Sequence, residues 1–219
     1  EFVKHITGKD CHPIWEPITL TPEEEEIEEY IDPTKQTCVI SPCSSQRYGE
    51  NYNRSWPIEN FIQIIKYLLS EKNIQVILSG GVSITEVEYS ECFNKQDFSD
   101  ECLNLIGKTS IRQMASIIKK SQFVISPDSG PAHIGTLMNK PVIGLYAMSN
   151  PRRSGPYHSQ HWLINKYPEA LKLYEEIDLE TTKWGYKVKE PNAMQLISTH
   201  DAILKIDEVI SYVKKCDQN

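Results

Sequence analysis

Residues 123–133 of the chain read FVISPDSGPAH, and this stretch indicates the class of fold. It begins as a short apolar, β-branched run that is typical of a buried strand. Pro131 has a fixed φ that suits the first turn of a helix. Between strand and helix, Asp128, Ser129 and Gly130 form a tight polar connection. The stretch therefore predicts a strand that passes directly into a helix.

The same alternation of strand and helix extends along the chain from Thr37. Apolar, β-branched runs predict strands at Thr37–Ile40, Ile74–Leu78, Leu103–Ile106, Phe123–Ser126 and Val142–Tyr146. Helices are expected between them near residues 58–71, 84–94, 110–120 and 131–138, and two more, Glu169–Ile177 and Thr199–Lys215, are expected to close the chain. The expected fold is α/β, a Rossmann-like parallel sheet with helices on both faces.

Apolar side chains at helical spacing predict which faces of these helices are buried. The helix near 84–94 has only a weak pattern of this kind. The expected buried stripes are Phe61, Ile64, Ile65, Leu68 and Leu69 in the first helix, Ile111, Met114, Ala115, Ile117 and Ile118 in the third, and Ile203, Ile206, Val209, Ile210 and Val213 in the last.

Residues 1–36 are expected to form a linker and an acidic helix, and residues 37–219 a single sheet domain with a C-terminal helix. Thr21 suits the N-cap of the acidic helix, Pro22 suits its first turn, and the glutamates up to Glu29 suit the positive end of the helix dipole.

Composition excludes several classes of function. The chain has 219 residues and a net charge of −7, which argues against a general nucleic-acid binder. Its six cysteines are scattered, without the spacing of a zinc site or a disulfide scaffold, which favours reduced thiols in the cytoplasm. No run of about 18 apolar residues occurs that could span a bilayer. No metal site is evident in the sequence.

The polar, glycine-rich clusters all follow predicted strands, whereas loops that return from helices to strands, such as Asn139–Pro141, carry no comparable cluster. Because the carboxyl ends of parallel strands meet at one edge of the sheet, where ligands of such folds bind, this asymmetry predicts a binding site there. The clusters are Ser41–Arg47 with Asn53–Pro57, Ser79–Gly81, Pro127–His133 and Ala147–Arg153.

The cluster that begins at Asp128 has two interpretations. In the first, Gly130 admits a ligand to the backbone, and the amides of Ala132 and His133 with the Ser129 hydroxyl bind a phosphate at the start of a helix. Asp128 would repel a phosphate and is expected to hold the loop or a sugar hydroxyl. In the second, the segment is an ordinary helix start capped by Asp128 and Ser129. We expect His133 to pack or hydrogen-bond at the loop rather than act as a base.

The other clusters supply candidate contacts to a nucleotide. Arg47 and Arg54 could neutralise a diphosphate, or could be solvated surface charges. Gly80 and Gly81 could admit a nucleoside to the backbone, and Glu86 or Glu88 could bind ribose hydroxyls. Arg152 and Arg153 form a further basic pair, to which the sequence assigns no role.

Several motifs in order resemble the ADP-heptose:lipopolysaccharide heptosyltransferases of glycosyltransferase family 9. The resemblance covers roughly residues 38–156. It is carried by Ser41-Pro42-Cys43-Ser44, Arg54-Ser55-Trp56-Pro57, Leu78-Ser79-Gly80-Gly81, Asn104–Ser110, Ser126–His133 and Asn150–Pro156.

The resemblance implies that this chain is the C-terminal, donor-binding domain, one half of a two-domain GT-B enzyme. The resemblance implies donor contacts by Arg54, Glu86, Asp128, Ser129, Gly130 and His133. With the candidates from the loops themselves, the expected donor-binding residues are Ser44, Arg47, Arg54, Gly80, Gly81, Glu86, Asp128, Ser129, Gly130, Ala132 and His133. The family's catalytic base is an acidic residue of an N-terminal acceptor domain that is expected to be absent here, so no catalytic residue is assigned. Cys43-Ser44 in place of Gly-Ala, and Ser55 in place of a second basic residue, depart from the family pattern.

The expected function is metal-free, inverting transfer of heptose from ADP-heptose to the lipopolysaccharide inner core, without a cofactor. The expected partners are the nucleotide sugar and, through the absent domain, a lipid A-core acceptor; the expected location is the cytoplasm, with peripheral association at the inner membrane. A UDP-sugar transferase, an epimerase of the same architecture and a non-catalytic binding module are the alternatives.

Overall fold

The computed structural model describes residues 8–9, 19–20, 27–44 and 54–216. The start of the expected acidic helix, at Thr21 and Pro22, lies outside the described residues, as does Arg47. Near the end of that expected helix, Glu28–Tyr30 forms a 3-10 turn, η1.

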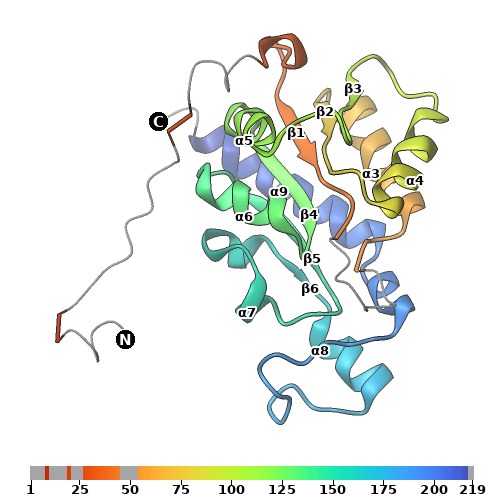
Figure 1. Ribbon diagram of the computed structural model, residues 1–219, viewed down its shortest axis with the longest axis vertical. Coiled ribbons are helices and arrows are strands. Elements are labelled where there is room, and N and C mark those ends of the chain that lie inside the picture. The colour runs from red at the N-terminus through yellow and green to blue at the C-terminus, as the bar shows by residue number, and fades with distance from the viewer. Residues whose placement is uncertain (1–7, 10–18, 21–26, 45–53, 217–219) are drawn as a thin grey trace.

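The described strands form a single parallel sheet, which confirms the expected fold class (Figure 1). The strands are β1 (Thr37–Ile40), β2 (Gln75–Leu78), β3 (Cys102–Asn104), β4 (Phe123–Pro127), β5 (Val142–Tyr146) and β6 (Ile164–Asn165). Their order is β3-β2-β1-β4-β5-β6, and every neighbouring pair is parallel. The five predicted strands are all present, and β6 was missed because two residues are too short to form a pattern.

The helices agree with the predicted segments to within a few residues. The longer ones are α3 (Ile58–Ser70), α4 (Ile84–Asn94), α5 (Ile111–Lys120), α6 (Gly130–Leu137) and α9 (Thr199–Cys216). The shorter ones are α7 (Pro151–Ser154), η2 (Tyr157–Trp162), α8 (Tyr167–Ala170), the π-helical turn η3 (Leu171–Glu175) and η4 (Pro191–Leu196). The segment expected as one helix at Glu169–Ile177 is therefore α8 followed by η3.

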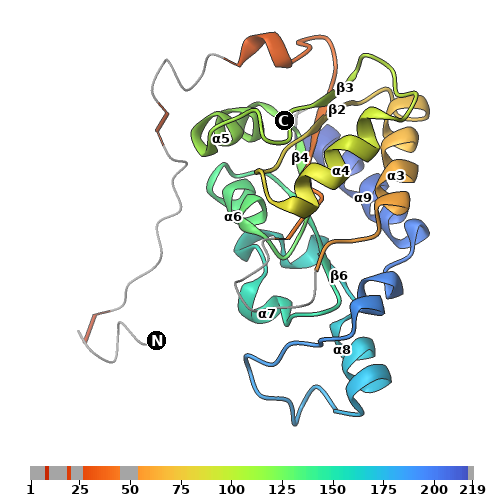
Figure 2. The same cartoon turned by 45° about the vertical axis from the view of Figure 1, so that its right-hand side comes forward.

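Two apolar clusters cover opposite faces of the sheet because side chains alternate along each strand. Cys38 and Ile40 of β1 belong to the cluster that includes residues of α3 and α9, whereas Val39 belongs to the cluster that includes residues of α5 and α6. Figures 1 and 2 show α3 and α9 on one side of the sheet and α5 and α6 on the other. The sheet is therefore doubly wound, with its core on both faces.

The prediction for one residue of the core is wrong. Ile111 was expected in the buried stripe of α5, but its side chain is 74% exposed. It is the first residue of the helix, immediately after the N-cap Ser110, and lies outside the apolar cluster formed by Met114, Ala115, Ile117 and Ile118.

Gly135 sets how closely α6 approaches the sheet. A Cβ atom at this position would lie 2.5 Å from Cγ2 of Val142 and 3.4 Å from Cγ2 of Val124. We expect Gly135→Ala to lower the free energy of unfolding by about 1–3 kcal/mol because the core is overpacked. Gly130→Ala on the same helix is the matched control, because no other atom in the described part of the chain lies within 4 Å of its Cβ position. Urea titration followed by circular dichroism checks both; equal stability of the two variants would contradict the close packing.

Candidate functional site

The parallel sheet brings the polar clusters of β1, β2, β4 and β5 to one edge. β1 lies between β2 and β4, so the chain winds in one direction from β1 to β3 and in the other from β4 to β6. In doubly wound sheets the crevice at such a switch point, beyond the carboxyl ends of the strands, is where ligands bind. Asp128, which follows β4, lies directly at this point.

Asp128 joins loops from three strands. Its Oδ2 atom accepts hydrogen bonds from Ser149 Oγ at 2.7 Å and Ser154 Oγ at 3.2 Å, and lies 3.8 Å from Nε of Arg54. The Arg54 and Asp128 side chains are only 8% and 15% exposed, so water screens this ion pair weakly. Asp128 was expected either to hold the loop or to bind a sugar hydroxyl, and these contacts show that it holds the loop.

The buried Tyr146 hydroxyl lies close to the same charges. Burial raises the pKa of Tyr146 well above its ordinary value; the Asp128 carboxylate raises it further, and the Arg54 guanidinium partly offsets this. The hydroxyl donates a hydrogen bond to the carbonyl of Ser154 at 3.3 Å. Tyr146 therefore stays neutral at physiological pH and supports the loop after β5.

Backbone hydrogen bonds hold Arg54 in place, in addition to the ion pair between its side chain and Asp128. Its amide donates to Ser44 Oγ at 3.0 Å, while the amide of Ser44 donates to Ser55 Oγ at 2.9 Å. These two bonds form a clasp between residues that are ten and eleven positions apart. The clasp fixes both ends of the loop after β1, and Arg47 lies between them, outside the described residues.

The Ser129 side chain, at the start of α6, forms its hydrogen bond away from the helix. Ser129 is the N-cap residue but makes no side-chain capping bond; its Oγ lies 2.7 Å from Oγ of Ser126 instead. The alternative of a helix start capped by Asp128 and Ser129 is therefore not what the structure shows. Gly130 is exposed, and among the described residues nothing lies within 4 Å of its Cβ position, so none of these side chains blocks the approach to the backbone here.

His133 and Ala132 lie on α6 in different environments. Ala132 is fully buried and its amide donates to the carbonyl of Ser129 at 3.3 Å, so the expectation that this amide is free to bind a phosphate is wrong. The side chain of His133 is exposed, and within the described part of the chain no hydrogen bond to it is found. The expectation that His133 packs or hydrogen-bonds at the loop stays a prediction, because residues 45–53 of the loop after β1 lie outside the described residues.

Glu86 has a structural task that the functional interpretation overlooked. Its carboxylate accepts bonds from the amides of Gly81 and Ser83, at 2.6 and 2.9 Å, and from Ser83 Oγ at 2.6 Å. Ser83 and Glu86 form a capping box at the start of α4, which the Ser-x-x-Glu spacing in the sequence could have revealed. Gly80 is buried beneath this turn and Gly81 is exposed on it.

The sequence and structure together place the chain in a class and then in a family. The class is a doubly wound α/β domain whose polar loops meet at the switch point. The sequence model of the family described as glycosyltransferase family 9 (heptosyltransferase) matches residues 2–183, and the chain belongs to this family.

Known proteins of this family resemble the chain over most of its length. It is 32% identical to the lipopolysaccharide core heptosyltransferase OpsX of Haemophilus influenzae over 215 residues, which are 98% of this chain and 58% of that protein. The fold matches the Veillonella parvula family 9 glycosyltransferase (TM-score 0.71, 19% identity, 96% of this chain and 58% of that one). It also matches the E. coli ADP-heptose lipopolysaccharide heptosyltransferase II (TM-score 0.66, 18% identity, 93% and 56%). The chain thus spans somewhat more than half of each.

The burial of Cys43, in the segment that follows β1, can be tested directly. Burial, with the charges of Glu86 and Glu88, raises the pKa of its thiol to about 12, although a hydrogen bond with Ser55 acts in the opposite direction. The folded protein therefore favours the neutral thiol over the thiolate. The stability that the neutral thiol contributes is complete below the ordinary thiol pKa of about 9 and is lost as pH rises through about 12.

At pH 8 we expect iodoacetamide to label the exposed Cys216 rapidly and Cys43 at least about a thousandfold more slowly than in the urea-unfolded chain, because the thiolate is the reactive form. Peptide mass spectrometry over time measures both rates. Equal labelling of Cys43 and Cys216 in the folded protein would show that Cys43 is not buried.

Proposed function

We propose that this chain is the donor-binding part of an inverting glycosyltransferase that transfers heptose from ADP-heptose to the lipopolysaccharide inner core. Family membership and the similarity to a lipopolysaccharide core heptosyltransferase support the reaction class. The observation that carries the proposal is the ion pair between Arg54 and Asp128, which fixes a buried cation beside the uncapped start of α6.

In this proposal the diphosphate of the donor binds between Arg54 and the first turn of α6. The amides at the start of a helix attract anions, and an Arg guanidinium binds phosphate oxygens with charge-assisted hydrogen bonds. Gly130 lets the phosphates approach the backbone, since no atom of the described residues lies within 4 Å of its Cβ position. Asp128 repels phosphate, so it faces the sugar side of the donor while it positions Arg54.

The reaction places growing negative charge on this site. An acceptor hydroxyl attacks the anomeric carbon, the bond from that carbon to the diphosphate oxygen breaks, and ADP leaves with the bonding electrons. Arg54 and the helix amides are oriented before reaction, and preorganised groups of this kind stabilise a transition state strongly. We assign the base that takes the acceptor proton to a domain outside this chain, and neutralisation by Arg54 makes a divalent metal unnecessary.

The nucleoside is proposed to lie over Gly80 and Gly81. Glu86 shapes this turn and retains one binding position for a ribose hydroxyl, because a carboxylate offers about four acceptor sites and three are occupied. Glu86 therefore supports the nucleoside in two ways, through the turn and by a direct bond.

The acceptor implied by this function is a lipid-linked saccharide, which would bring the enzyme to the cytoplasmic face of the inner membrane as a peripheral protein. Among the described residues, none of the helices combines the length and apolar character that a bilayer span requires. Association through the acceptor, without a span in these helices, is consistent with that finding.

Calorimetric titration with ADP tests the proposal. We expect Arg54→Ala to weaken ADP binding about 10–100-fold, since a charge-assisted hydrogen bond contributes about 1.5–3 kcal/mol. Asp128→Asn should weaken it about 3–10-fold, because Arg54 loses its positioning partner but keeps its charge. Lys119→Ala is the control and should leave ADP affinity unchanged, because Lys119 is exposed in the last turn of α5, the end of the helix away from the carboxyl edge of the sheet.

UDP separates the alternatives in the same experiment. Tighter binding of UDP than of ADP would favour a UDP-sugar transferase or an epimerase. Absence of binding to either nucleotide, or equal ADP affinity in Arg54→Ala and the unchanged protein, would contradict the proposed site and favour a non-catalytic module.

A further inference from the structure

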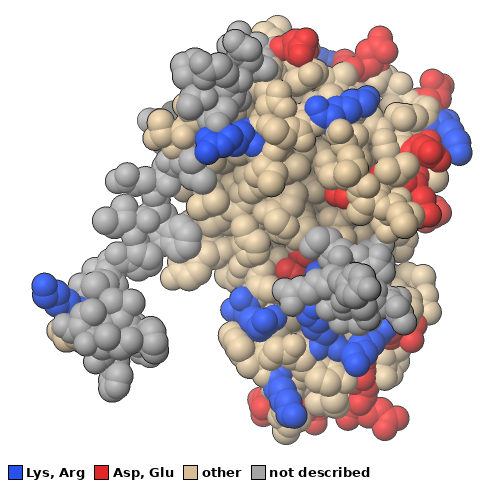
Figure 3. Space-filling view, in the orientation of Figure 1, with Lys and Arg blue, Asp and Glu red and all other residues tan. Residues whose placement is uncertain are grey.

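A second group of cations lies on the same edge of the sheet, beyond the proposed donor site. We define the basic strip as Arg152 and Arg153 of α7 together with the segment Lys183–Lys189. Figure 3 shows Lys and Arg side chains gathering over the lower part of the face where Figure 1 places α7. The proposed function leaves these residues without a role.

The basic strip is fastened to the sheet by several contacts. Lys187 forms an antiparallel bridge with Ser149, and the amide of Val188 donates to the carbonyl of Met148 at 3.0 Å. Glu175 holds the other side, accepting bonds from the Tyr186 hydroxyl at 2.6 Å and the Lys189 amide at 3.2 Å. The backbone of residues 186–189 is therefore held against the loop after β5 on one side and against Glu175 on the other.

The strip presents cations beside an exposed aromatic ring. Residues 181–189 contain three lysines and no acidic residue, and the Trp184 side chain in their middle is 61% exposed. A Cβ atom at Gly185 would lie 3.8 Å from Nε of Arg153, so the guanidinium of α7 reaches this segment. Within the described residues, neither Arg152 nor Arg153 forms an ion pair with an acidic side chain. This arrangement suits an anionic ligand with an apolar face.

The strip is directly connected to the donor site. Ser149 pairs with Lys187 through its backbone and with Asp128 through its hydroxyl at 2.7 Å. A ligand bound to the strip would therefore lie beside the loop that is proposed to face the sugar of the donor. That is the position from which a hydroxyl of the ligand could reach the anomeric carbon.

We propose that the basic strip binds the carboxylate or phosphate groups of an acidic saccharide acceptor, with a sugar ring packed against the flat face of Trp184. This inference rests on the proposed function. Arg and Lys supply the charge-assisted bonds, and an indole ring supplies an apolar surface for the C–H face of a sugar. The acceptor is thus held partly by the donor-binding domain.

An anionic membrane surface is the competing occupant, and the observations favour it less. A membrane-binding surface needs a larger apolar area than a single exposed Trp provides. Glu176, Asp178 and Glu180 lie just before the strip in the sequence, on exposed positions, and would be repelled by anionic lipid. A short saccharide occupies only the strip and avoids these charges.

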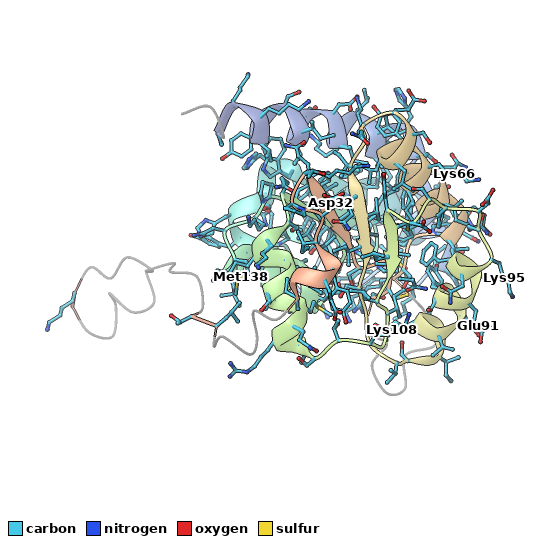
Figure 4. The ribbon with its side chains drawn as sticks, turned by 90° about the horizontal axis from the view of Figure 1, so that it is seen from above. Asp32, Lys66, Glu91, Lys95, Lys108 and Met138 are labelled. Atoms are coloured by element: carbon cyan, nitrogen blue, oxygen red, sulfur yellow. The ribbon has the colours of Figure 1, made fainter. Side chains whose placement is uncertain are left out.

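The test compares two probes of different charge and a membrane on the purified chain. The acidic probe is trigalacturonate, the neutral probe is maltotriose, and the membrane arm uses phosphatidylglycerol vesicles, all at low ionic strength, where charge contacts are weakly screened. The variant is Arg153→Gln with Lys187→Gln. The matched control is Lys66→Gln with Lys95→Gln, which removes the same charge from exposed positions on the outer side of α3 and at the end of α4 (Figure 4).

We expect trigalacturonate to bind the unchanged protein and the control variant with similar affinity. Its affinity for the strip variant should be lower by about fivefold or more. Maltotriose should bind none of the three proteins detectably. Trp184→Ala should weaken trigalacturonate binding in the same direction. ADP affinity, measured on the same samples, should change less than about twofold in every variant, which also shows that each is folded.

Three results would overturn the inference. In the first, trigalacturonate does not bind the unchanged protein, or it binds the strip variant with equal affinity. In the second, the strip variant loses affinity for ADP as well as for trigalacturonate. In the third, vesicle binding depends on the strip and trigalacturonate binding does not. The second would assign these cations to the donor and the third to a membrane. Failure of ADP to bind the unchanged protein is a separate outcome: it refutes the proposed function and removes the basis for an acceptor site.

Discussion

The Asp128 carboxylate joins the loops that follow three strands of the sheet. It accepts bonds from Ser149 and Ser154 and pairs with Arg54, so the loops after β1, β4 and β5 have fixed relative positions. Removing two charges from water is costly, and a weakly exposed ion pair persists only where further hydrogen bonds satisfy it. The two serine hydroxyls provide such bonds.

This arrangement explains how a chain with a net charge of −7 could bind an anion. The overall charge is spread over the surface, whereas the Arg54 side chain is only 8% exposed, so its charge acts in a region of weak screening. The open start of α6 adds the partial positive charge of a helix N-terminus. The proposed acceptor strip lies next to this region through Ser149, so the carboxyl edge of β5 would serve both substrates.

Most of the fold could be predicted from the sequence because strands and helices leave periodic patterns. Phe61, Ile64, Ile65 and Leu68 repeat at helical spacing and are buried as expected. β6 and the shorter helices have too few residues for a pattern. The clasp between Ser44 and Ser55, and the bonds of Asp128 to Ser149 and Ser154, were not predictable because they join residues 11 to 26 positions apart. The Glu86 capping box was visible in local spacing and was overlooked in favour of a ligand role.

The central claim is that a donor diphosphate binds between Arg54 and the start of α6, and a crystal structure of the chain with ADP tests it most directly. The account predicts phosphate oxygens within hydrogen-bonding distance of the Arg54 guanidinium and of the Gly130 amide at the start of α6, with the Asp128–Ser149 bond intact. ADP bound at another edge of the sheet, or phosphates that contact neither Arg54 nor α6, would contradict it.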